Sequence, residues 1–375
     1  MLFSEYDLIF MNFHFIQYHD AKFSFVNSNF RLLLVANVLQ MFVFNQMGVQ
    51  FEITVLISIA LIWLYTFRGG IKTIIWTDTM QTLFMLLSLI FTIFFLKDHI
   101  NFEAGKGMVA AVADSSYSQI FFLADVNGAN HFVKMFFGGI FIAIGMTGLD
   151  QDMMQKNLSC RSIGAAQKNM MSFSALLIII NLVFLALGAL LYMYAQQNSI
   201  PIPLDEITGK ERTDLLFPQI ALRGGLPVGI GVLFILGLIA AAYSSADSAL
   251  TSLTTSVCVD FLGDKKEVST RKRKMIHLLM SGVLLFTVVV FKRMLDDAAI
   301  WQLITLAGYT YGPLIALFFF GILTPRNLKP KLIVWVAILA PLLTYLLNIY
   351  FKSKGFEFGA TLIILNALLT YSGLY

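Results

Sequence analysis

The sequence predicts an all-α protein that crosses a membrane many times. Of its 375 residues, 58% are hydrophobic and only 13% are charged, whereas a soluble domain is closer to half apolar and a quarter charged. Apolar runs long enough to cross a hydrocarbon core of about 30 Å recur along the chain. Helices satisfy their own backbone hydrogen bonds, as lipid requires, so these runs are expected to be helical.

We predict ten membrane-spanning helices from these runs. They cover residues 30–49, 52–67, 73–96, 134–153, 170–195, 227–258, 275–294, 299–323, 331–351 and 358–375. The first run is weakly apolar and the second is short. Two longer polar loops, 97–133 and 196–226, and a strongly basic loop at 263–274 separate these runs.

The distribution of lysine and arginine predicts the orientation. One alternating set of loops holds fourteen of these residues, many of them in the run GDKKEVSTRKRK. The other set holds ten, spread over longer loops that also carry many acidic residues. Because positive residues are enriched on the cytoplasmic side, we expect the first set and both termini in the cytoplasm, and a multi-pass protein of the plasma membrane.

Several partners and cofactors are not indicated. The net charge of +4 gives no reason to expect nucleic acid as a partner. The two cysteines, Cys160 and Cys258, lack the spacing of a metal site. The first residues carry acids and histidines where a signal peptide has a basic region and an apolar core. We therefore expect no cofactor and no transition-metal site.

The segment AAAYSSADSALTS, residues 240–252, places polar side chains inside an apolar run. A charged side chain near the bilayer centre costs roughly 2.5–3.5 kcal/mol, so a binding partner is expected to offset the cost of the aspartate. One helix face collects residues at spacings of i, i+3, i+4, i+7 and i+11, namely Ala241, Ser244, Ser245, Ser248 and Ser252. We call these residues the serine stripe. Asp247 and Thr251 form a second row beside it.

Oxygen ligands of this kind suit a hard cation such as sodium. Hydroxyl groups and a backbone carbonyl provide them without net charge, and a carboxylate adds affinity. The alternative interpretation is that small residues let helices pack closely and that the serines bond to their own helix. We favour the cation site, because two polar rows with an aspartate exceed what close packing requires.

Asp78 is a second acid inside a predicted span. It lies six residues after Lys72, and therefore about 9 Å into the membrane. Asp247 also falls in the cytoplasmic half of its span, so we expect the two carboxylates to face one cavity. Acids within membrane spans typically mark ion pathways. In the alternative interpretation, Asp78 lies near the interface and reaches headgroup water.

These segments together resemble the sodium/solute symporter family, which includes carriers of glucose, proline, iodide, vitamins and sialic acid. The resemblance covers about residues 30–375. Its strongest parts are YTFRGGIKTIIWTDTMQ (65–81), TGLDQDMMQKNLSCRSIGAAQK (147–168), AAAYSSADSALTSLTTSVCVDFL (240–262) and WQLITLAGYTYGPLIALFFFGILTP (301–325). Four motifs in the family's order make this match specific.

The resemblance implies a LeuT-like fold of two inverted five-helix repeats, with ion and substrate sites at mid-membrane where helices break. It assigns residues 30–96 to core helices three to five of the first repeat and 134–323 to core helices six to ten of the second. Residues 331–375 then form two additional helices. Residues 1–29 match nothing in the family, so the chain resembles a member that is truncated at its N-terminus.

The resemblance also implies two cation sites. The sodium site shared by the family uses one carbonyl and two hydroxyls, which match Ala241, Ser244 and Ser245. A second cation site, present in some members, matches Asp78, Ser244 and Ser248. Where those members have another serine, this chain has Asp247. Because two close carboxylates do not both ionise readily, the second site is left open to sodium, to a proton, or to a carboxylate pair that shares one proton.

The sequence predicts the residues of the substrate pathway less specifically than those of the cation sites. The segment FFGGIFIAIGMTGLDQ contains glycines that would permit the break expected in core helix six, and YTYGP places two tyrosines beside a Gly-Pro pair in core helix ten. The pathway residues that we predict are Gly145, Gln151, Tyr309 and Tyr311. Each has an alternative role in packing, in a loop or at the membrane interface. The expected partners are the lipid bilayer, sodium and a small organic solute or anion.

The function that follows is sodium-coupled symport by alternating access, and not enzymatic catalysis. A non-transporting remnant of a symporter is the first alternative, because core helices one and two are unmatched. An intramembrane aspartyl protease is a remote alternative, since the two aspartates occur in WTD and SAD, which are not its motifs. A serine hydrolase would need a histidine inside a span, and we interpret His277 as interfacial.

Core helix one supplies the remaining carbonyl ligands of the shared sodium site in the family. We therefore expect that residues 1–375 alone do not transport. The measurement is uptake driven by a sodium gradient into liposomes that contain the purified chain, and uptake of any solute would contradict this expectation.

Overall fold

The computed structural model describes residues 32–33, 35–103, 105–149, 160–204, 209, 211–258, 269–294, 299–324 and 330–375. Within these ranges the backbone is almost entirely helical, and the β contacts amount to one isolated bridge between Leu204 and Glu211. The all-α class that composition predicts is therefore confirmed.

The first apolar helix, Val35–Phe44, has an irregular end. It passes into a π-helical turn, η1 (Gln40–Phe44), and then a 3-10 turn, η2 (Asn45–Met47). Gly48 follows with a φ of 67°, in the left-handed region where glycine ends helices without strain. A short connection then leads directly into the next helix.

That helix, α2 (Phe51–His99), differs from our prediction. The sequence predicts two spans, 52–67 and 73–96, with a turn between them, whereas the structure has one helix of 49 residues. No proline interrupts this stretch, so every residue keeps the N–H group that the helix requires. The glycines at 69 and 70 cost about 1 kcal/mol each relative to alanine, and they do not end the helix.

The other helices follow the predicted spans closely. They are α3 (Met108–Asp114), α4 (Phe132–Ala143) with its continuation η4 (Ile144–Gly148), α6 (Ile163–Gln197), α7 (Leu216–Arg223), α8 (Val228–Ser256), α9 (Thr270–Met294), α10 (Ala299–Leu323), α11 (Pro330–Ser353) and α12 (Leu362–Leu374). Short 3-10 turns are η3 (Ser116–Ser118), η5 (Thr213–Leu215) and η7 (Gly359–Thr361).

Every predicted span overlaps an apolar helical segment. By length and composition, five of the described helices suffice to cross a membrane: Thr79–His99, Ile163–Gln197, Arg271–Lys292, Ile304–Leu323 and Leu332–Ser353. The other apolar helices are shorter: Val35–Phe44, Phe51–Trp63, Phe132–Gly148, Val228–Ala241 and Gly359–Leu374. The positions of the helices are thus as predicted, and the number of crossings remains a prediction.

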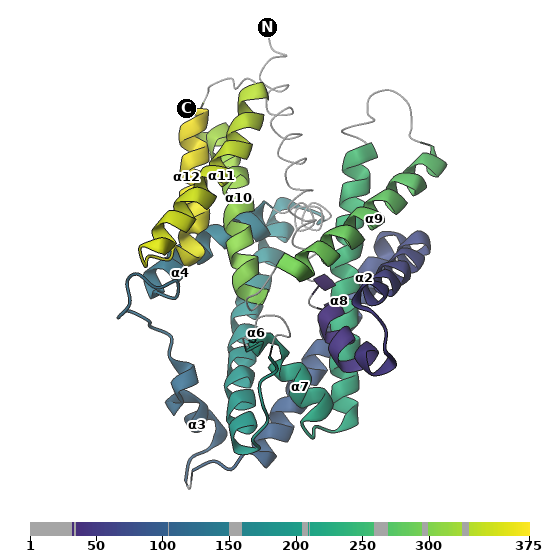
Figure 1. Cartoon of the computed structure of the whole chain (residues 1–375), viewed down its shortest axis with the longest axis vertical. Helices are drawn as coiled ribbons and strands as arrows, with labels where there is room; N and C mark the ends of the chain where they lie inside the picture. Colours follow the sequence, from purple (N-terminus) through teal and green to yellow (C-terminus); the bar gives the residue numbers. More distant parts are fainter. Residues whose placement is uncertain are drawn as a thin grey trace.

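Two packed groups of helices surround separate apolar cores (Figure 1), and a further core joins α2 and α8 to α6 and α7. In one group, α8 packs against α2 and α9, and in the other, α12 packs between α10 and α11. In Figure 1, α3 and α7 lie at the lower end of the molecule, opposite the C-terminus. The loops that contain α3 and α7, which our orientation places on the same side, therefore lie at one end.

Polar contacts hold the first helix in place. The Gln40 side chain is buried, and both ends of its amide form hydrogen bonds. Its Nε2 donates to Asn45 Oδ1 at 2.7 Å and to the Val49 carbonyl at 2.6 Å. Its Oε1 accepts a hydrogen bond from Thr54 Oγ1 of α2 at 2.5 Å. Because a buried amide without partners is costly, this network fixes η1 against the start of α2.

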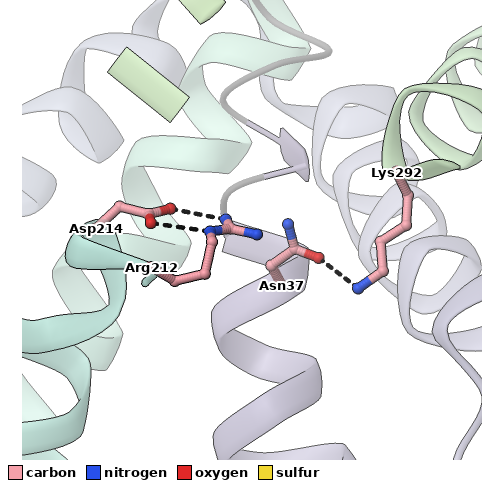
Figure 2. A network of polar contacts seen from close by, with 4 residues as sticks. All are labelled: Asn37, Arg212, Asp214 and Lys292. Atoms are coloured by element: carbon pink, nitrogen blue, oxygen red, sulfur yellow. Dashed lines mark hydrogen bonds and ion pairs between the residues drawn. The ribbon is translucent and has the colours of Figure 1, made fainter. Parts of the chain in front are cut away.

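Two cations from later helices also bind the first helix. Lys292, near the end of α9, donates from Nζ to Asn37 Oδ1 at 2.9 Å (Figure 2). Arg223, at the end of α7, donates to the Met41 carbonyl at 3.2 Å. Figure 2 also shows the ion pair between Arg212 and Asp214, which holds the approach to α7 through two hydrogen bonds of 3.0 and 2.8 Å.

Helix α4 packs closely against η7, the turn that precedes α12. Lys134 Nζ donates to three carbonyls, those of Asn127, Gly128 and Glu357, at 3.1, 3.2 and 2.6 Å. One turn later, a Cβ added to Gly138 would lie 2.4 Å from the carbonyl carbon of Ala360. Lys134 thus holds two loop segments together, and the absence of a side chain at Gly138 lets the backbones of α4 and η7 come into contact.

Gly138 and its neighbour Gly139 provide a matched test of this contact. A Cβ at Gly139 meets nothing within 4 Å. We expect Gly138→Ala to lower the midpoint of thermal unfolding, with a cost of about 1–3 kcal/mol from overpacking. Gly139→Ala is expected to be neutral or stabilising, because alanine favours helix by up to about 1 kcal/mol. Equal shifts for both variants in detergent would contradict the contact.

Candidate functional site

The serine stripe lies in the middle of α8, which is continuous helix from Val228 to Ser256. Ala241 and Ser244 are half-buried. The side chains of Asp78, Ser245, Asp247 and Ser248 lie outside the described residues, although the backbone is helical at all four positions. The placement of these residues therefore follows from the helices that carry them.

One glycine shows which way the stripe is turned. Gly237 lies four residues before Ala241, so it continues the face that carries Ser244 and Ser248. A Cβ added to Gly237 would lie 2.8 Å from Met85 Cγ and 3.1 Å from the Met85 backbone nitrogen. Met85 belongs to α2, so the face of α8 that carries Ala241 and Ser244 is turned toward α2.

The two helices run in opposite directions. Ile59, early in α2, shares an apolar cluster with Leu250, late in α8. Leu96, late in α2, shares another cluster with Ile230, early in α8. The two helices are therefore antiparallel, so moving toward the start of α2 corresponds to moving toward the end of α8.

Asp78 and Ser244 lie at matching distances from the contact between Met85 and Gly237, each along its own helix. Asp78 lies seven residues before Met85 on α2, and Ser244 lies seven residues after Gly237 on α8. Seven residues are about two helical turns, so each position is about 10.5 Å from the contact, on the facing side of its own helix. The backbone positions of Asp78 and Ser244 are thus each about two turns from the contact, in corresponding directions along the antiparallel pair.

The second polar row continues along α8 toward α9. Asp247, Thr251 and Thr254 follow at spacings of four and three residues, which places the three positions on one face. Thr254 is buried, and its Oγ1 lies 3.1 Å from His277 Nδ1 on α9. The sequence suggests an interfacial role for His277, and the structure shows it half-buried against α8.

The segment in which we expected a helix break contains a π-helical turn. Helix α4 gives way to η4 at Ile144, and the turn ends at Gly148. Such turns are rare inside helices and are frequent at functional sites. Gly145 in η4 is buried, and a Cβ there would lie 3.2 Å from both Tyr311 and Ile315 of α10. The structure thus brings together Gly145 and Tyr311, two of the predicted pathway residues.

Helix α10 has its own irregularity at Pro313. Proline has no N–H group, so the carbonyl four residues earlier, on Tyr309, loses its helical partner. Asn366 of α12 replaces it, because its Nδ2 donates to that carbonyl at 2.7 Å and to the Gly308 carbonyl at 3.0 Å. Gly312 permits the approach, since a Cβ there would lie 2.6 Å from Asn366 Cβ.

The remaining pathway predictions have other surroundings. The Tyr309 hydroxyl accepts a hydrogen bond from Asn348 of α11 at 2.8 Å, and its ring packs edge-on against Tyr345. Tyr309 is therefore turned toward α11, whereas Tyr311 contacts η4. Gln151 lies outside the described residues.

Two buried amide side chains that hold irregular backbone were not predicted from the sequence. Gln40 lies in the weakest predicted span, and Asn366 lies in the apolar run LIILNALL. Pro313 was a usable signal for a hydrogen-bond donor, because it leaves a carbonyl without a partner within α10. The donor itself was not identifiable, because it comes from another helix.

Comparison with known proteins identifies the family of the chain. The model of the sodium:solute symporter family matches residues 34–349. The chain belongs to this family. Its members are transporters, so the resemblance to sodium-coupled symporters that the four motifs indicate is confirmed.

This symporter-family chain is similar to several characterised relatives. It is 27% identical over 289 residues to a sodium/sialic acid symporter of Proteus mirabilis, with 75% of this chain and 56% of the relative covered. It is 26% identical over 292 residues to a sodium/sialic acid symporter of Aliivibrio fischeri, with 75% of this chain and 55% of the relative covered. It is 28% identical over 279 residues to the sodium-dependent multivitamin transporter of Oryctolagus cuniculus, with 72% of this chain and 42% of the relative covered. The chain spans about half the length of these relatives.

A solved structure of a sodium-coupled sialic acid symporter in a substrate-bound, outward-open state has the same fold. The two align with a TM-score of 0.68 and 21% sequence identity, covering 98% of this chain and 72% of that structure. The LeuT-like fold expected for this symporter-family chain is thus confirmed, and the chain is a multi-pass membrane protein.

The register of α2 and α8 can be tested with paired cysteines. In a background with Cys160→Ser and Cys258→Ser, we expect Asp78→Cys and Ser244→Cys to be joined by a short bifunctional thiol reagent, because facing positions at one level are within its reach. A protease site inserted at 205–208 shows the link as two fragments that stay together on a denaturing gel. Asp78→Cys with Val232→Cys, about 18 Å further along α8, is expected not to link, and the reverse pattern would contradict the register.

Proposed function

We propose that this chain carries the cation sites of a sodium-coupled symporter that moves a small organic solute or anion by alternating access. The observation that carries the proposal is the close antiparallel contact of α2 and α8 at Met85 and Gly237, from which we infer that Asp78 lies level with the serine stripe. Acids inside membrane spans are costly and mark ion pathways, and a hydroxyl-rich facing helix supplies the neutral oxygens that a hard cation prefers. Because the chain spans about half of its relatives, the transport cycle is proposed for the protein that contains these residues.

The roles of the residues follow from their places on the helices. The shared sodium site would use the Ala241 carbonyl and the hydroxyls of Ser244 and Ser245. The second cation site would use Asp78, Ser244, Asp247 and Ser248. Both sites include positions on the face of α8 that is turned to α2, so movement of α2 relative to α8 changes the ligand sets together.

The solute would bind where the two irregular helices meet. The π turn η4 and the Pro313 region of α10 are in contact through Gly145 and Tyr311. Irregular backbone at membrane depth is tolerated where it lines a cavity or is covered by protein, and transporters of this fold place their sites at such breaks. Tyr311 is therefore the pathway residue that we favour, and Tyr309 serves the packing of α10 on α11.

Coupling requires that sodium bind better to one state than to the other. A ligand shifts a conformational equilibrium only by its differential affinity, and the effect of sodium on solute binding is reciprocal. Sodium from outside would stabilise the solute-binding state and then leave to the cytoplasm, where sodium is scarce. No step of this cycle makes or breaks a covalent bond, so we propose transport and not catalysis.

We propose that the protein lies in the plasma membrane and that both of its termini are in the cytoplasm. The support for this orientation is the excess of lysine and arginine in one set of loops. The end of α8 and the C-terminus both lie toward the upper end of the molecule in Figure 1, away from α3 and α7. The cytoplasmic half of α8 is then the half that contains Asp247 and Thr254.

Replacing one proposed ligand tests the shared site. Ser245→Ala removes a hydroxyl and is expected to raise the dissociation constant for sodium about tenfold, equivalent to about 1.4 kcal/mol. The measurement is binding of radioactive sodium to the purified chain in lipid nanodiscs. Ser174→Ala, at an exposed position of α6, is the control and should leave binding unchanged. Unchanged binding in Ser245→Ala would remove this residue from the site, and absence of saturable sodium binding by the unmodified chain would overturn the proposed function.

A further inference from the structure

The loop between α3 and α4 is apolar where it approaches α4, although the sequence predicts a polar loop at 97–133. Between residues 120 and 126, five large apolar side chains are 43% to 68% exposed: Ile120, Phe121, Phe122, Leu123 and Val126. We call residues 120–126 the apolar loop. Figure 1 shows the chain between α3 and α4 along the outer edge of the molecule. Exposed apolar patches of this kind mark surfaces that contact a membrane or another protein.

Hydrogen bonds to α4 and to the end of α11 fix the position of the apolar loop. The Phe132 N–H, at the first residue of α4, donates to the Phe122 carbonyl at 2.9 Å. The Glu357 N–H, four residues after the last residue of α11, donates to the Asn127 carbonyl at 2.8 Å. Lys134 of α4 binds the carbonyls of Asn127 and Glu357 as well. The apolar loop therefore lies at the level where α4 begins and α11 ends.

The length of α11 shows that this level is a membrane surface. The apolar part of α11, Leu332–Ser353, has 22 residues, and at 1.5 Å per residue it is about 33 Å long. This length matches a hydrocarbon core of about 30 Å, so one end of α11 lies at each membrane surface. The apolar loop is level with the end at Ser353. In the orientation that we propose, this end is at the outer surface.

The apolar loop is continuous with an exposed apolar face of α4. Residues at spacings of i, i+3, i+4 and i+7 form this face, namely Val133, Phe136, Phe137 and Ile140, and all four are exposed. The Phe121 ring packs against the Phe132 ring with centroids 4.9 Å apart, and the Phe132 ring stacks on that of Phe136 at 6.0 Å. An exposed apolar face is what a membrane helix presents to lipid, and this row of rings extends that face to the loop.

We propose that the apolar loop is a membrane-binding segment that lies in the headgroup region and takes zwitterionic phospholipids of that surface as its partner. Its backbone sets the depth. Residues 119–123 have no regular secondary structure, and irregular backbone exposed to lipid is not tolerated in the hydrocarbon core, where no water satisfies its polar groups. The exposed carboxylate of Asp125 also requires the headgroup region, because a charge deeper in the bilayer is costly.

The charges around the apolar loop give anionic lipids no advantage. Lys352 and Lys354 are exposed at this level, but the carboxylates of Asp125 and Glu357 accompany them, and Lys352 pairs with Glu357 at 3.6 Å. The Lys134 ammonium is directed to backbone carbonyls. Burial of apolar side chains, which any phospholipid provides, is therefore what holds the loop at the membrane.

The membrane contact has a mechanical consequence for α4. Lys134 joins the loop carbonyls to the first turn of this helix, and the other end of α4 continues into the π turn η4. A loop held by lipid thus holds the outer end of α4 in place, while η4 remains free to shift against α10. The inference requires that the chain be a membrane protein, and it does not depend on the proposed cation sites.

Spin labels measure whether the apolar loop contacts lipid. In a background with Cys160→Ser and Cys258→Ser, a nitroxide is attached to Leu123→Cys or, as a control, to Val109→Cys on α3, and the chain is placed in phosphatidylcholine nanodiscs. Both positions are exposed, and α3 carries a water-exposed ion pair between Lys106 and Asp114. Oxygen concentrates in lipid, whereas a nickel chelate stays in water. We expect the ratio of oxygen to nickel collisions to be several-fold higher at 123 than at 109.

Further measurements separate the possible occupants of this surface. Ile120→Cys should give the same high ratio as Leu123→Cys, and adding phosphatidylglycerol to the nanodiscs should leave both ratios unchanged. Equal ratios at 123 and 109 would place the loop in water and overturn the inference. Few collisions with either reagent would show that protein covers the loop, and a high ratio only with phosphatidylglycerol would show attraction by charge; both results would also overturn it. A chain that binds no sodium but keeps the high ratio would overturn the proposed function and leave this inference standing.

Discussion

The close approach of α2 to α8 at Gly237 is the contact on which the proposed sites depend. Met85 lies where a larger residue at 237 would place its Cβ, so the two backbones meet more closely here than ordinary side chains allow. This contact fixes both the face of α8 that is turned to α2 and the level of each residue along it. A shift of one turn would move Asp78 by about 5.4 Å relative to the serine stripe, which is too far for one cation to contact both.

A second constraint is that buried backbone groups need partners. The π turn η4 and the proline in α10 both interrupt regular helix, and they occur where the two helices touch. The donor for the carbonyl released by Pro313 comes from Asn366, on a helix outside the ten-helix core that the family resemblance implies. Similarly, the π turn at Gln40 is held by an amide whose partners lie in the following loop and in α2. Irregular backbone is thus maintained by polar side chains that belong to neighbouring elements.

Much of this arrangement was accessible from the sequence, and the reasons for the exceptions are physical. Apolar length located the helices, and periodicity placed Ala241, Ser244 and Ser248 on one face. Hydropathy did not show that α2 continues through residues 68–72, because a short polar interval can either turn or remain helical. The partnership of Thr254 with His277 was also hidden, because spacing along one helix does not reveal which side chain faces it from another. The site residues on α8 could be grouped from sequence, whereas their neighbours required the packing.

The hydrogen bond from Asn366 to the Tyr309 carbonyl has a consequence for how this chain can change over generations. Asparagine at 366 is useful because residue 313 is proline, and proline at 313 is tolerable because residue 366 donates a hydrogen bond. A residue with an N–H group at 313 would satisfy the Tyr309 carbonyl within α10, and Asn366 would keep only its hydrogen bond to the Gly308 carbonyl. We therefore expect Pro313 and Asn366 to vary together, so that related sequences without the proline also lack the asparagine.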